Sequence, residues 1–288
     1  MEARAVSGVR ASRLLAFVGA LSSAAVFACT PLKPRDDSPI GEGFADRDAA
    51  VLSLAGSAPS WACLASMERR ETLIRPADDG QRWVYSVRAL NLLSGQVIPE
   101  LSVRACRATD VNCQDPLGEA RLADQDGWVD VPVNEGFTGY FEFTAPTIVP
   151  EMIFYSRLLP SNRGLRNPHG MLERDALAAL AGALGTTQSP GAGVLAMRLY
   201  DCNGSPAEGV EISQDRGGQP WYFVDGLPSR DATATTAQGL GGFANVPPGI
   251  AVLSAKLEDG MSLGPGQSVL VRAGWLTTLA FDPSGRPD

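Results

Sequence analysis

Residues 232–249 read Ala-Thr-Ala-Thr-Thr-Ala-Gln-Gly-Leu-Gly-Gly-Phe-Ala-Asn-Val-Pro-Pro-Gly. Gly239 suits a hairpin turn, because glycine adopts a positive φ at little steric cost. The Pro-Pro-Gly that ends the stretch fixes the bend into a following strand. These residues are folding signals rather than catalytic ones. They predict short strands connected by tight turns.

The same order of signals occurs earlier in the chain. Residues 120–133 read Ala-Arg-Leu-Ala-Asp-Gln-Asp-Gly-Trp-Val-Asp-Val-Pro-Val, again with a glycine that closes a turn before an alternating strand. Residues 87–103 match 194–210 in the same way, with Ser94-Gly95 at the turn position of Asn203-Gly204. We interpret the chain as two copies of one module.

Alternation of side chains predicts the strands of the first copy. The alternating segments are 83–89, 101–106, 128–133 and 139–144, and the apolar run 152–155 closes the block. Short strands with frequent turns are typical of a β-sandwich. Between the copies, Leu172, Leu177, Leu180 and Leu184 predict one helix, which Gly185 ends in a left-handed conformation.

The predicted fold is therefore mainly β. We expect two tandem Ig-like or prealbumin-like β-sandwiches joined by a short helical segment and preceded by a lipoprotein signal peptide and a flexible tether. The predicted boundaries are 1–28 for the signal peptide, 29–60 for the lipidated cysteine and tether, 61–160 for the first sandwich, 161–190 for the helical linker and 191–288 for the second sandwich.

The second copy resembles the carboxypeptidase regulatory-like family, whose modules are transthyretin-like (prealbumin-like) β-sandwiches. Its matching residues are Gly204, Pro206, Gly209-Val210, 236–239 and 243–249, whereas Ala251 stands near the position of the family's usual aromatic residue. The first copy matches at Ser94-Gly95, 124–127 and Gly139-Tyr140-Phe141, without the Pro-Gly ending. The resemblance implies the fold and is not specific for function. Tandem modules that follow a lipobox, the short motif before a lipidated cysteine, are also similar to bacterial surface lipoproteins.

The leader of the chain predicts export. Three arginines, at positions 4, 10 and 13, precede the apolar run 14–27, which is too short for a bilayer span of about 20 residues. Val26-Phe27-Ala28-Cys29 then resembles a bacterial lipobox, in which the cysteine becomes the lipidated first residue. An ordinary secretion signal and an uncleaved anchor are the alternatives. Thr30 after the cysteine favours the outer membrane, by resemblance to enterobacterial sorting.

Charge limits the classes of partner. The net charge is −8 at pH 7 and becomes −10 without the leader, which holds three arginines and one glutamate. Such a surface repels nucleic acid and anionic lipid head groups. We therefore expect attachment to the membrane through the lipid anchor and no nucleic-acid partner, with a protein or glycan partner left open.

Four cysteines remain besides Cys29: Cys63, Cys106, Cys113 and Cys202. An even number in an exported chain is typical of two disulfides, for which three pairings exist. Cys106 and Cys113 enclose a short polar loop, so we pair them, which leaves Cys63 for Cys202. The alternative is a four-thiolate zinc site, whose usual short-spaced cysteine pairs are absent from the sequence.

Residues suited to catalysis are few. The one histidine, His169, lies in Asn167-Pro-His-Gly170, which we expect to be a loop, and no Gly-x-Ser-x-Gly elbow accompanies it. One imidazole is too few for a catalytic zinc site. The acidic residues Asp124, Asp126 and Asp130 resemble part of a calcium loop but fit a solvated hairpin turn better. Residues 239–243 are rich in glycine without a P-loop lysine. We predict no catalytic residue, metal or cofactor.

One aromatic run is a candidate binding surface. Trp221, Tyr222 and Phe223 either form an exposed platform for a sugar or a protein, or alternate into the core. The function we expect is that of a non-enzymatic cell-envelope lipoprotein with a structural or partner-binding role. The alternative is a carbohydrate-binding surface module that uses the aromatic residues near Trp221.

Processing of the leader is directly testable. Mass spectrometry of the membrane-extracted protein is expected to find an acylated Cys29 at the N-terminus, because the basic and apolar leader ends in Ala28-Cys29. A soluble mature chain that begins at another residue would contradict this prediction.

Overall fold

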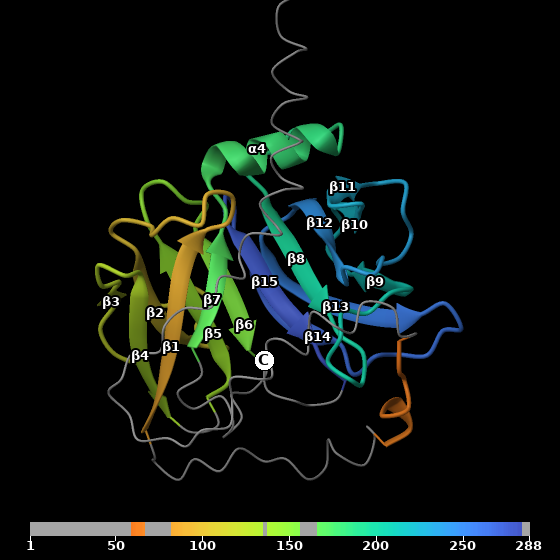
Figure 1. Ribbon diagram of the computed structural model, residues 1–288, viewed down its shortest axis with the longest axis horizontal. Coiled ribbons are helices and arrows are strands. Elements are labelled where there is room, and N and C mark those ends of the chain that lie inside the picture. The colour runs from red at the N-terminus through yellow and green to blue at the C-terminus, as the bar shows by residue number, and fades with distance from the viewer. Residues whose placement is uncertain (1–58, 67–81, 135–136, 156–165, 284–288) are drawn as a thin grey trace, which may run out of the picture.

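The computed structural model describes residues 59–66, 82–134, 137–155 and 166–283 (Figure 1). Within these ranges the protein is mainly β, with three sheets, the 3-10 helix η1 (Leu64–Ser66) and the α-helix α4 (Arg174–Ala183). None of the described helices is long and apolar enough to cross a membrane. The predicted signal peptide, Cys29 and most of the tether lie outside the described residues.

The strands form a first and a second half of the chain. The first half comprises β1 (Arg82–Asn91), β2 (Ser102–Arg107), β3 (Arg121–Leu122), β4 (Trp128–Asn134), β5 (Gly139–Thr144), β6 (Glu151–Tyr155) and β7 (Arg166–Met171). The second half comprises β8 (Gly193–Leu199), β9 (Val210–Gln214), β10 (Gln219–Val224), β11 (Leu227–Ser229), β12 (Leu240–Val246), β13 (Gly249–Leu257), β14 (Gln267–Val271) and β15 (Leu276–Phe281).

Both halves have the same strand arrangement. In the first half, β1 pairs antiparallel with β4 and parallel with β7, and this layer packs on β6-β5-β2. In the second half, β8 pairs antiparallel with β12 and parallel with β15, and this layer packs on β14-β13-β9. The matching order agrees with the repeat seen in the sequence.

Sheet pairing joins the halves directly. Strand β15 pairs parallel with β8 on one side and with β6 on the other, so one nine-stranded sheet runs β11-β10-β12-β8-β15-β6-β5-β2-β3 (Figure 1). The sequence analysis expected a helical segment to connect the two sandwiches. Hydrogen bonding of β6 to β15 satisfies backbone groups that two separate sheets would leave at open edges. Alternation within a strand contains no information about which strand lies beside it.

Each half has its own apolar core. In the first, Phe141 and Phe143 are fully buried, and the ring of Phe141 stacks on Tyr85 at a centroid distance of 4.3 Å. In the second, Leu195 and Leu253 are fully buried. Full burial of a side chain of this size contributes about 1.5–3 kcal/mol. The alternating strands of the sequence therefore account for both cores.

The segment predicted as a helical linker divides between two elements. Helix α4 occupies 174–183, and Gly185 adopts a φ of +62° just beyond it, as predicted. Residues 166–171 instead form β7 beside β1, so the loop prediction for His169 is wrong. The short β7 has no clear alternation, because Pro168 and Gly170 interrupt it, and only the pairing with β1 makes it a strand.

The residues before the first half are attached to the second half. Cys63 is disulfide-bonded to Cys202, and the backbone N–H of Ser60 donates to the buried carboxylate of Asp201 at 2.9 Å. Trp61 packs against the core of the second half. Residues 61–66, which the predicted boundaries assign to the first sandwich, are therefore fixed to the other one.

A pair of glycines tests the packing of the second half. A Cβ on Gly242 would lie 2.5 Å from Cζ2 of Trp221 and closer still to the carbonyl of Leu195, whereas a Cβ on Gly182 in α4 would meet nothing within 4 Å. We expect G242A to lower the free energy of unfolding by about 1–3 kcal/mol. G182A should raise it by about 0.5–1 kcal/mol, because alanine is the better helix former. Urea denaturation measures both, and equal midpoints would contradict the packing.

Candidate functional site

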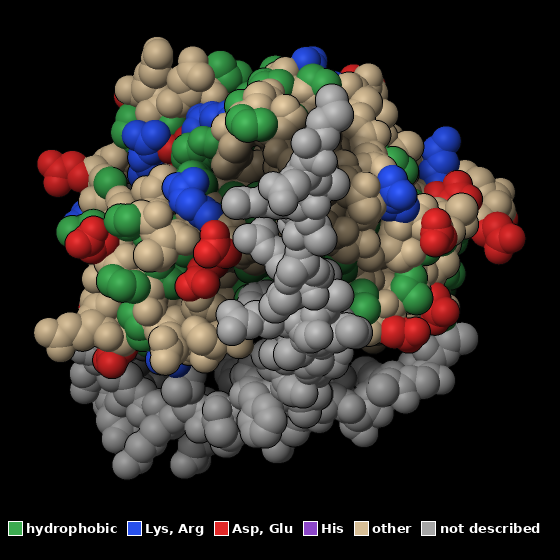
Figure 2. Space-filling model, turned by 90° about the horizontal axis from the view of Figure 1, so that it is seen from above, with side chains coloured by type: hydrophobic (Ala, Val, Ile, Leu, Met, Phe, Trp, Pro, Cys, Tyr) green, Lys and Arg blue, Asp and Glu red, His purple; other side chains and the backbone are tan. Residues whose placement is uncertain are grey.

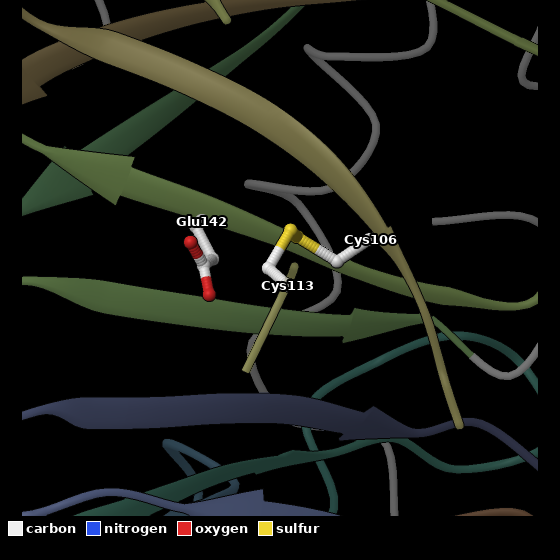
Figure 3. A group of neighbouring side chains, drawn as sticks. All are labelled: Cys106, Cys113 and Glu142. Atoms are coloured by element: carbon white, nitrogen blue, oxygen red, sulfur yellow. A yellow bond between two sulfur atoms is a disulfide. The ribbon is translucent and has the colours of Figure 1, made fainter. Parts of the chain in front are cut away.

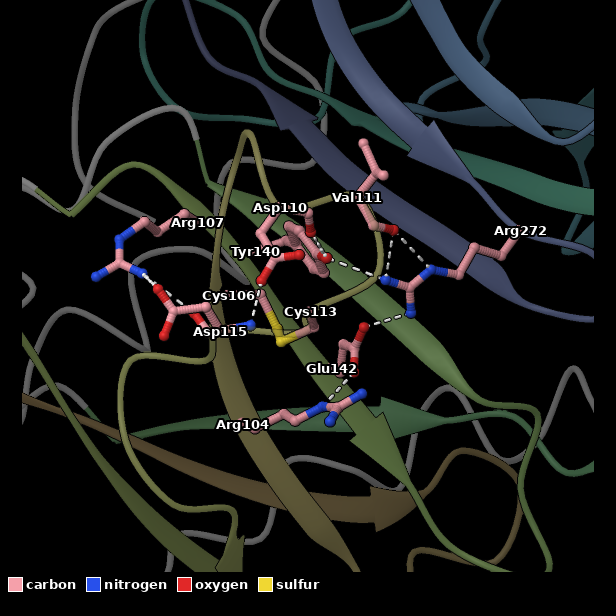
Figure 4. The surroundings of a disulfide bond; sticks show 10 residues. All are labelled: Arg104, Cys106, Arg107, Asp110, Val111, Cys113, Asp115, Tyr140, Glu142 and Arg272. Atoms are coloured by element: carbon pink, nitrogen blue, oxygen red, sulfur yellow. Dashed lines mark hydrogen bonds and ion pairs between the residues drawn. A yellow bond between two sulfur atoms is a disulfide. The ribbon is translucent and has the colours of Figure 1, made fainter.

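The most unusual polar group is a buried carboxylate at the junction of the two halves. Glu142 on β5 is 1% exposed and accepts a hydrogen bond from Nε of Arg104 at 2.5 Å. Its other oxygen pairs with Nη1 of Arg272, which follows β14 (Figure 4). An unpaired charge in such a position would cost several kcal/mol, and the two guanidiniums supply the partners that Glu142 needs.

Arg272 connects the second half to the first through several further contacts. Its Nε and Nη2 donate to the carbonyl of Val111, at 3.3 and 2.8 Å. Its Nη2 also donates to the hydroxyl of Tyr140 at 3.0 Å. The guanidinium lies 5.0 Å from the ring centroid of Trp275, within the range of a cation–π interaction. One side chain therefore holds together groups that lie more than a hundred residues apart.

Tyr140 extends this network to Asp110, which lies in the same loop as Val111. Its hydroxyl donates to the carbonyl of Asp110 at 2.5 Å, and its ring stacks on Phe154 at 4.9 Å. Burial raises the pKa of the Tyr140 hydroxyl above 10, with the Arg272 charge acting in the opposite direction. The phenol therefore stays protonated near neutral pH and keeps its role as a donor.

A disulfide closes the loop that presents these carbonyls. Cys106 and Cys113 are bonded to each other, and Cys63 is bonded to Cys202, which are the two pairings that the sequence analysis expects. Both sulfurs of the Cys106–Cys113 pair lie in a buried cluster with Tyr140, Met152 and Leu270. Leu270 belongs to β14, so this cluster spans the junction.

Hydrogen bonds also order the loop from within. Asp110 accepts a bond from the backbone N–H of Asp115 at 2.7 Å, which is the main reason that the pKa of Asp110 is lowered. The N–H of Cys113 donates to the carbonyl of Asp110 at 3.1 Å. These bonds lie within the loop, so the shape of the loop does not depend on Arg272 alone.

Cys106, Cys113 and Glu142 lie together, with one possible ligand atom of each within 4.8 Å of the others (Figure 3). A cysteine binds a metal ion as a thiolate, whereas these two sulfurs are bonded to each other. The carboxylate of Glu142 is in addition paired with two arginines. With the disulfide closed, this group is therefore structural rather than a metal centre.

His169 lies in a second polar cluster, around the buried carboxylate of Glu151. Its Nε2 is 3.1 Å from Oε1 of Glu151, and the Thr278 hydroxyl donates to the same oxygen at 2.8 Å. A catalytic triad places the imidazole between the hydroxyl and the acid. Here the carboxylate lies between the other two, so the arrangement joins β6, β7 and β15 and does not activate a nucleophile.

The acidic residues of the first hairpin have structural contacts. Oδ1 of Asp124 accepts the N–H groups of Asp126 and Trp128, both at 2.9 Å, and Asp130 accepts the Ser86 hydroxyl. These contacts favour the solvated-turn interpretation over the calcium loop.

The aromatic run does not form the platform that one of our interpretations predicts. Trp221 is 8% exposed and Tyr222 is 3% exposed, and Phe223 packs edge-on to Trp221 at 5.6 Å. The N–H of Ile212 on β9 donates to the Tyr222 hydroxyl at 3.1 Å, and burial raises the pKa of that hydroxyl. The exposed-platform prediction is wrong, because β10 pairs with β12 inside the nine-stranded sheet and α4 contributes to covering it.

The surface near the junction has one open groove of about 450 Å³. It is lined by Val111 and Asn112 of the disulfide loop and by Pro248–Ile250 and Leu270–Ala273 of the second half. On the face seen in Figure 2, basic side chains are spread among apolar and other ones, and several acidic side chains gather at the right-hand side of the view.

The sequence analysis missed the junction residues Glu142, Arg104 and Arg272. A signal for Glu142 exists, since it is the one charged residue in the aromatic strand Gly139-Tyr-Phe-Glu-Phe-Thr144. Arg272 has no comparable signal, because an arginine after a strand is ordinarily solvated.

Comparisons with known proteins give no family. No family model and no curated protein matches the chain. Solved structures similar to it include the major pilin subunit BcpA of Bacillus cereus, at 9% identity over 71% of this chain and 100% of that chain, with a TM-score of 0.24. The minor pilin GBS52 of Streptococcus agalactiae is 12% identical over 69% of this chain and 94% of that chain, with a TM-score of 0.24.

A third similar structure is the Bacillus anthracis TIE protein, at 9% identity over 70% of this chain and a TM-score of 0.20. The chain spans only 33% of that protein. TM-scores of this size assign neither a fold nor a role, so the architecture rests on the strand pairing itself.

The importance of the buried carboxylate can be measured with a charge-removing variant. We expect E142Q to lower the free energy of unfolding by about 3–5 kcal/mol, because it leaves Arg104 and Arg272 without their shared partner. D115N is the matched control, since it removes an exposed carboxylate whose partner is Arg107 in the same region. Chemical denaturation should show little effect of D115N. Equal losses in the two variants would contradict a special role for Glu142.

Proposed function

We propose that this protein is a non-enzymatic component of the bacterial cell envelope, lipid-anchored at Cys29, with a structural or partner-binding role. Its two halves act as one rigid body. The observation that carries the proposal is the Glu142–Arg272 ion pair, which is buried where the two halves share a sheet.

Rigidity follows from two independent connections. The backbone hydrogen bonds between β6 and β15 fix the direction of one half relative to the other. The polar network around Arg272 then fixes their separation, because opening the junction would break the contacts of Arg272 with Glu142, Val111 and Tyr140 together. A body of this kind holds a surface at a constant distance and orientation.

The uses of the buried ionisable groups favour a non-catalytic role. Among the described residues, Glu142 is neutralised by two arginines, Glu151 contacts His169 and Thr278, and Asp201 accepts backbone N–H groups. General acid–base catalysis needs a group that is free to exchange a proton with a substrate. Each of these carboxylates is instead engaged in holding segments of the chain together.

Location and partner follow from the sequence. The leader and Cys29 supply membrane attachment through a lipid, and Thr30 after the cysteine favours sorting to the outer membrane. The acidic net charge favours a protein partner over nucleic acid. Trp221 and Tyr222 are buried, so they do not offer the exposed aromatic surface that a glycan partner would need.

Rigidity can be tested with one fluorophore on each half, attached by non-cysteine chemistry at the exposed positions Leu122 and Met261. Single-molecule energy transfer should give one narrow distance distribution. R272Q should broaden it, because it removes the charge that pairs with Glu142, whereas R107Q should not. A broad distribution in the unmodified oxidised chain would contradict the rigid body.

Catalysis is tested separately. Purified protein is expected to show no peptidase, esterase or glycosidase turnover, because His169 and Glu151 are engaged with each other inside the structure. A turnover that one substitution in either half abolishes would overturn the non-enzymatic proposal.

A further inference from the structure

We propose that the Cys106–Cys113 disulfide loop is a redox-sensitive latch that holds the second half of the protein against the first. The inference rests on the rigid coupling proposed above and adds a means of regulating it. With the disulfide closed the latch is engaged, and with the two thiols free the junction loosens.

The loop contacts Arg272 of the second half through the backbone carbonyl of Val111 and, by way of Tyr140 on β5, through that of Asp110. The carbonyl of Val111 receives two N–H donors of Arg272, and the carbonyl of Asp110 receives the hydroxyl of Tyr140. Tyr140 in turn accepts an N–H of Arg272. A backbone carbonyl points toward a neighbouring donor only while its backbone keeps one conformation. The disulfide therefore has a specific role, which is to hold the loop in that conformation.

The disulfide lies inside the junction rather than beside it. Cys106 is 0% exposed and Cys113 is 3% exposed, and both pack with Leu270 of β14. Cys113 adopts a φ of +49°, which is unfavourable for a residue with a side chain. Closing the disulfide holds this residue in place, so the strained backbone conformation depends in part on the bond.

Reduction changes the packing of this cluster. A dithiol reductant supplies two electrons and two protons, the S–S bond becomes two thiols, and the reductant leaves as its own disulfide. The sulfurs then separate from a bond of about 2.05 Å to a non-bonded distance of about 3.5 Å. A close-packed cluster accommodates such a change by moving a neighbour, and the neighbours here include Leu270 of the second half as well as Tyr140 and Met152.

Release of the loop would leave each core intact. Arg104 stays on β2 and continues to pair with Glu142, whereas Arg272 loses the carbonyl of Val111 that orients it. The wall of the open groove that Val111 and Asn112 form would move with the loop. The predicted change is therefore confined to the junction and to the groove beside it.

The second disulfide provides a matched control. Cys63–Cys202 fixes residues 59–66 to the second half, and the N–H of Cys202 donates to the carbonyl of Ser60 in that segment. The full chain carrying C29S, C63S and C202S therefore retains one redox-active pair. In a mild detergent, the same protein can be measured oxidised, reduced with a phosphine or dithiol, and oxidised again.

Hydrogen exchange measured by mass spectrometry reports on the junction in these states, while alkylation of free thiols verifies the redox state. Reduction should increase exchange at least tenfold in residues 107–115. It should do the same for the amide of Leu276, which donates to the carbonyl of Pro150 across the junction. The core amides of β8 and β13 should be unchanged, and reoxidation should restore the slow rates.

Two results would overturn the latch. In the first, residues 107–115 exchange faster on reduction while Leu276 does not, which shows that the loop is not coupled to the junction. In the second, no segment changes although both thiols are alkylated. The C106S/C113S variant, which cannot re-form the bond, should reproduce the reduced state, and C63S/C202S alone should not.

The fluorophore pair at Leu122 and Met261 separates this proposal from the proposed function. A broad distance distribution in the oxidised chain contradicts the rigid body itself. A narrow distribution that stays narrow on reduction contradicts only the latch. A narrow distribution that broadens reversibly supports both.

Discussion

A charge that must stay buried governs how the two halves of this protein fit together. Glu142 is enclosed on β5 and needs the guanidiniums of Arg104 and Arg272, which come from opposite halves. Removing either cation leaves a carboxylate without solvent and without a full set of partners. The shared sheet, the disulfide loop and the aromatic rings of Tyr140 and Trp275 are all arranged around Arg272.

Open strand edges are the second constraint, and the protein closes them in two ways. Pairing of β6 with β15 removes one edge from each half. The edge strand β9 is capped by side chains, since Ile212 donates to the hydroxyl of Tyr222 and Val210 to the hydroxyl of Thr235. Unpaired edges invite association with other chains, so these contacts remove sites at which a second chain could pair. Tyr222 is therefore a structural residue rather than a ligand-binding one.

Local patterns were sufficient for several strands of the first half and for the helix. Alternation located β1, β2, β4 and β5, and the leucine spacing located α4, because a half-buried strand and an amphipathic helix each impose a period on their own residues. The two disulfide pairings also follow from local spacing and elimination. The pattern was insufficient for β7, where Pro168 and Gly170 interrupt it, and for Trp221, whose exposure depends on which strand lies beside β10.

The sequence by itself determined the class of the fold, the repeat and the positions of the turns, since these depend on neighbouring residues and on the backbone freedom of glycines such as Gly127 and Gly239. Only the tertiary structure decided that the two halves share one sheet, that residues 59–66 attach to the second half, and that Glu142 meets Arg272. Contacts of this kind join residues separated by more than a hundred positions. They are selected by the burial and pairing of groups whose surroundings exist only after the strands have packed.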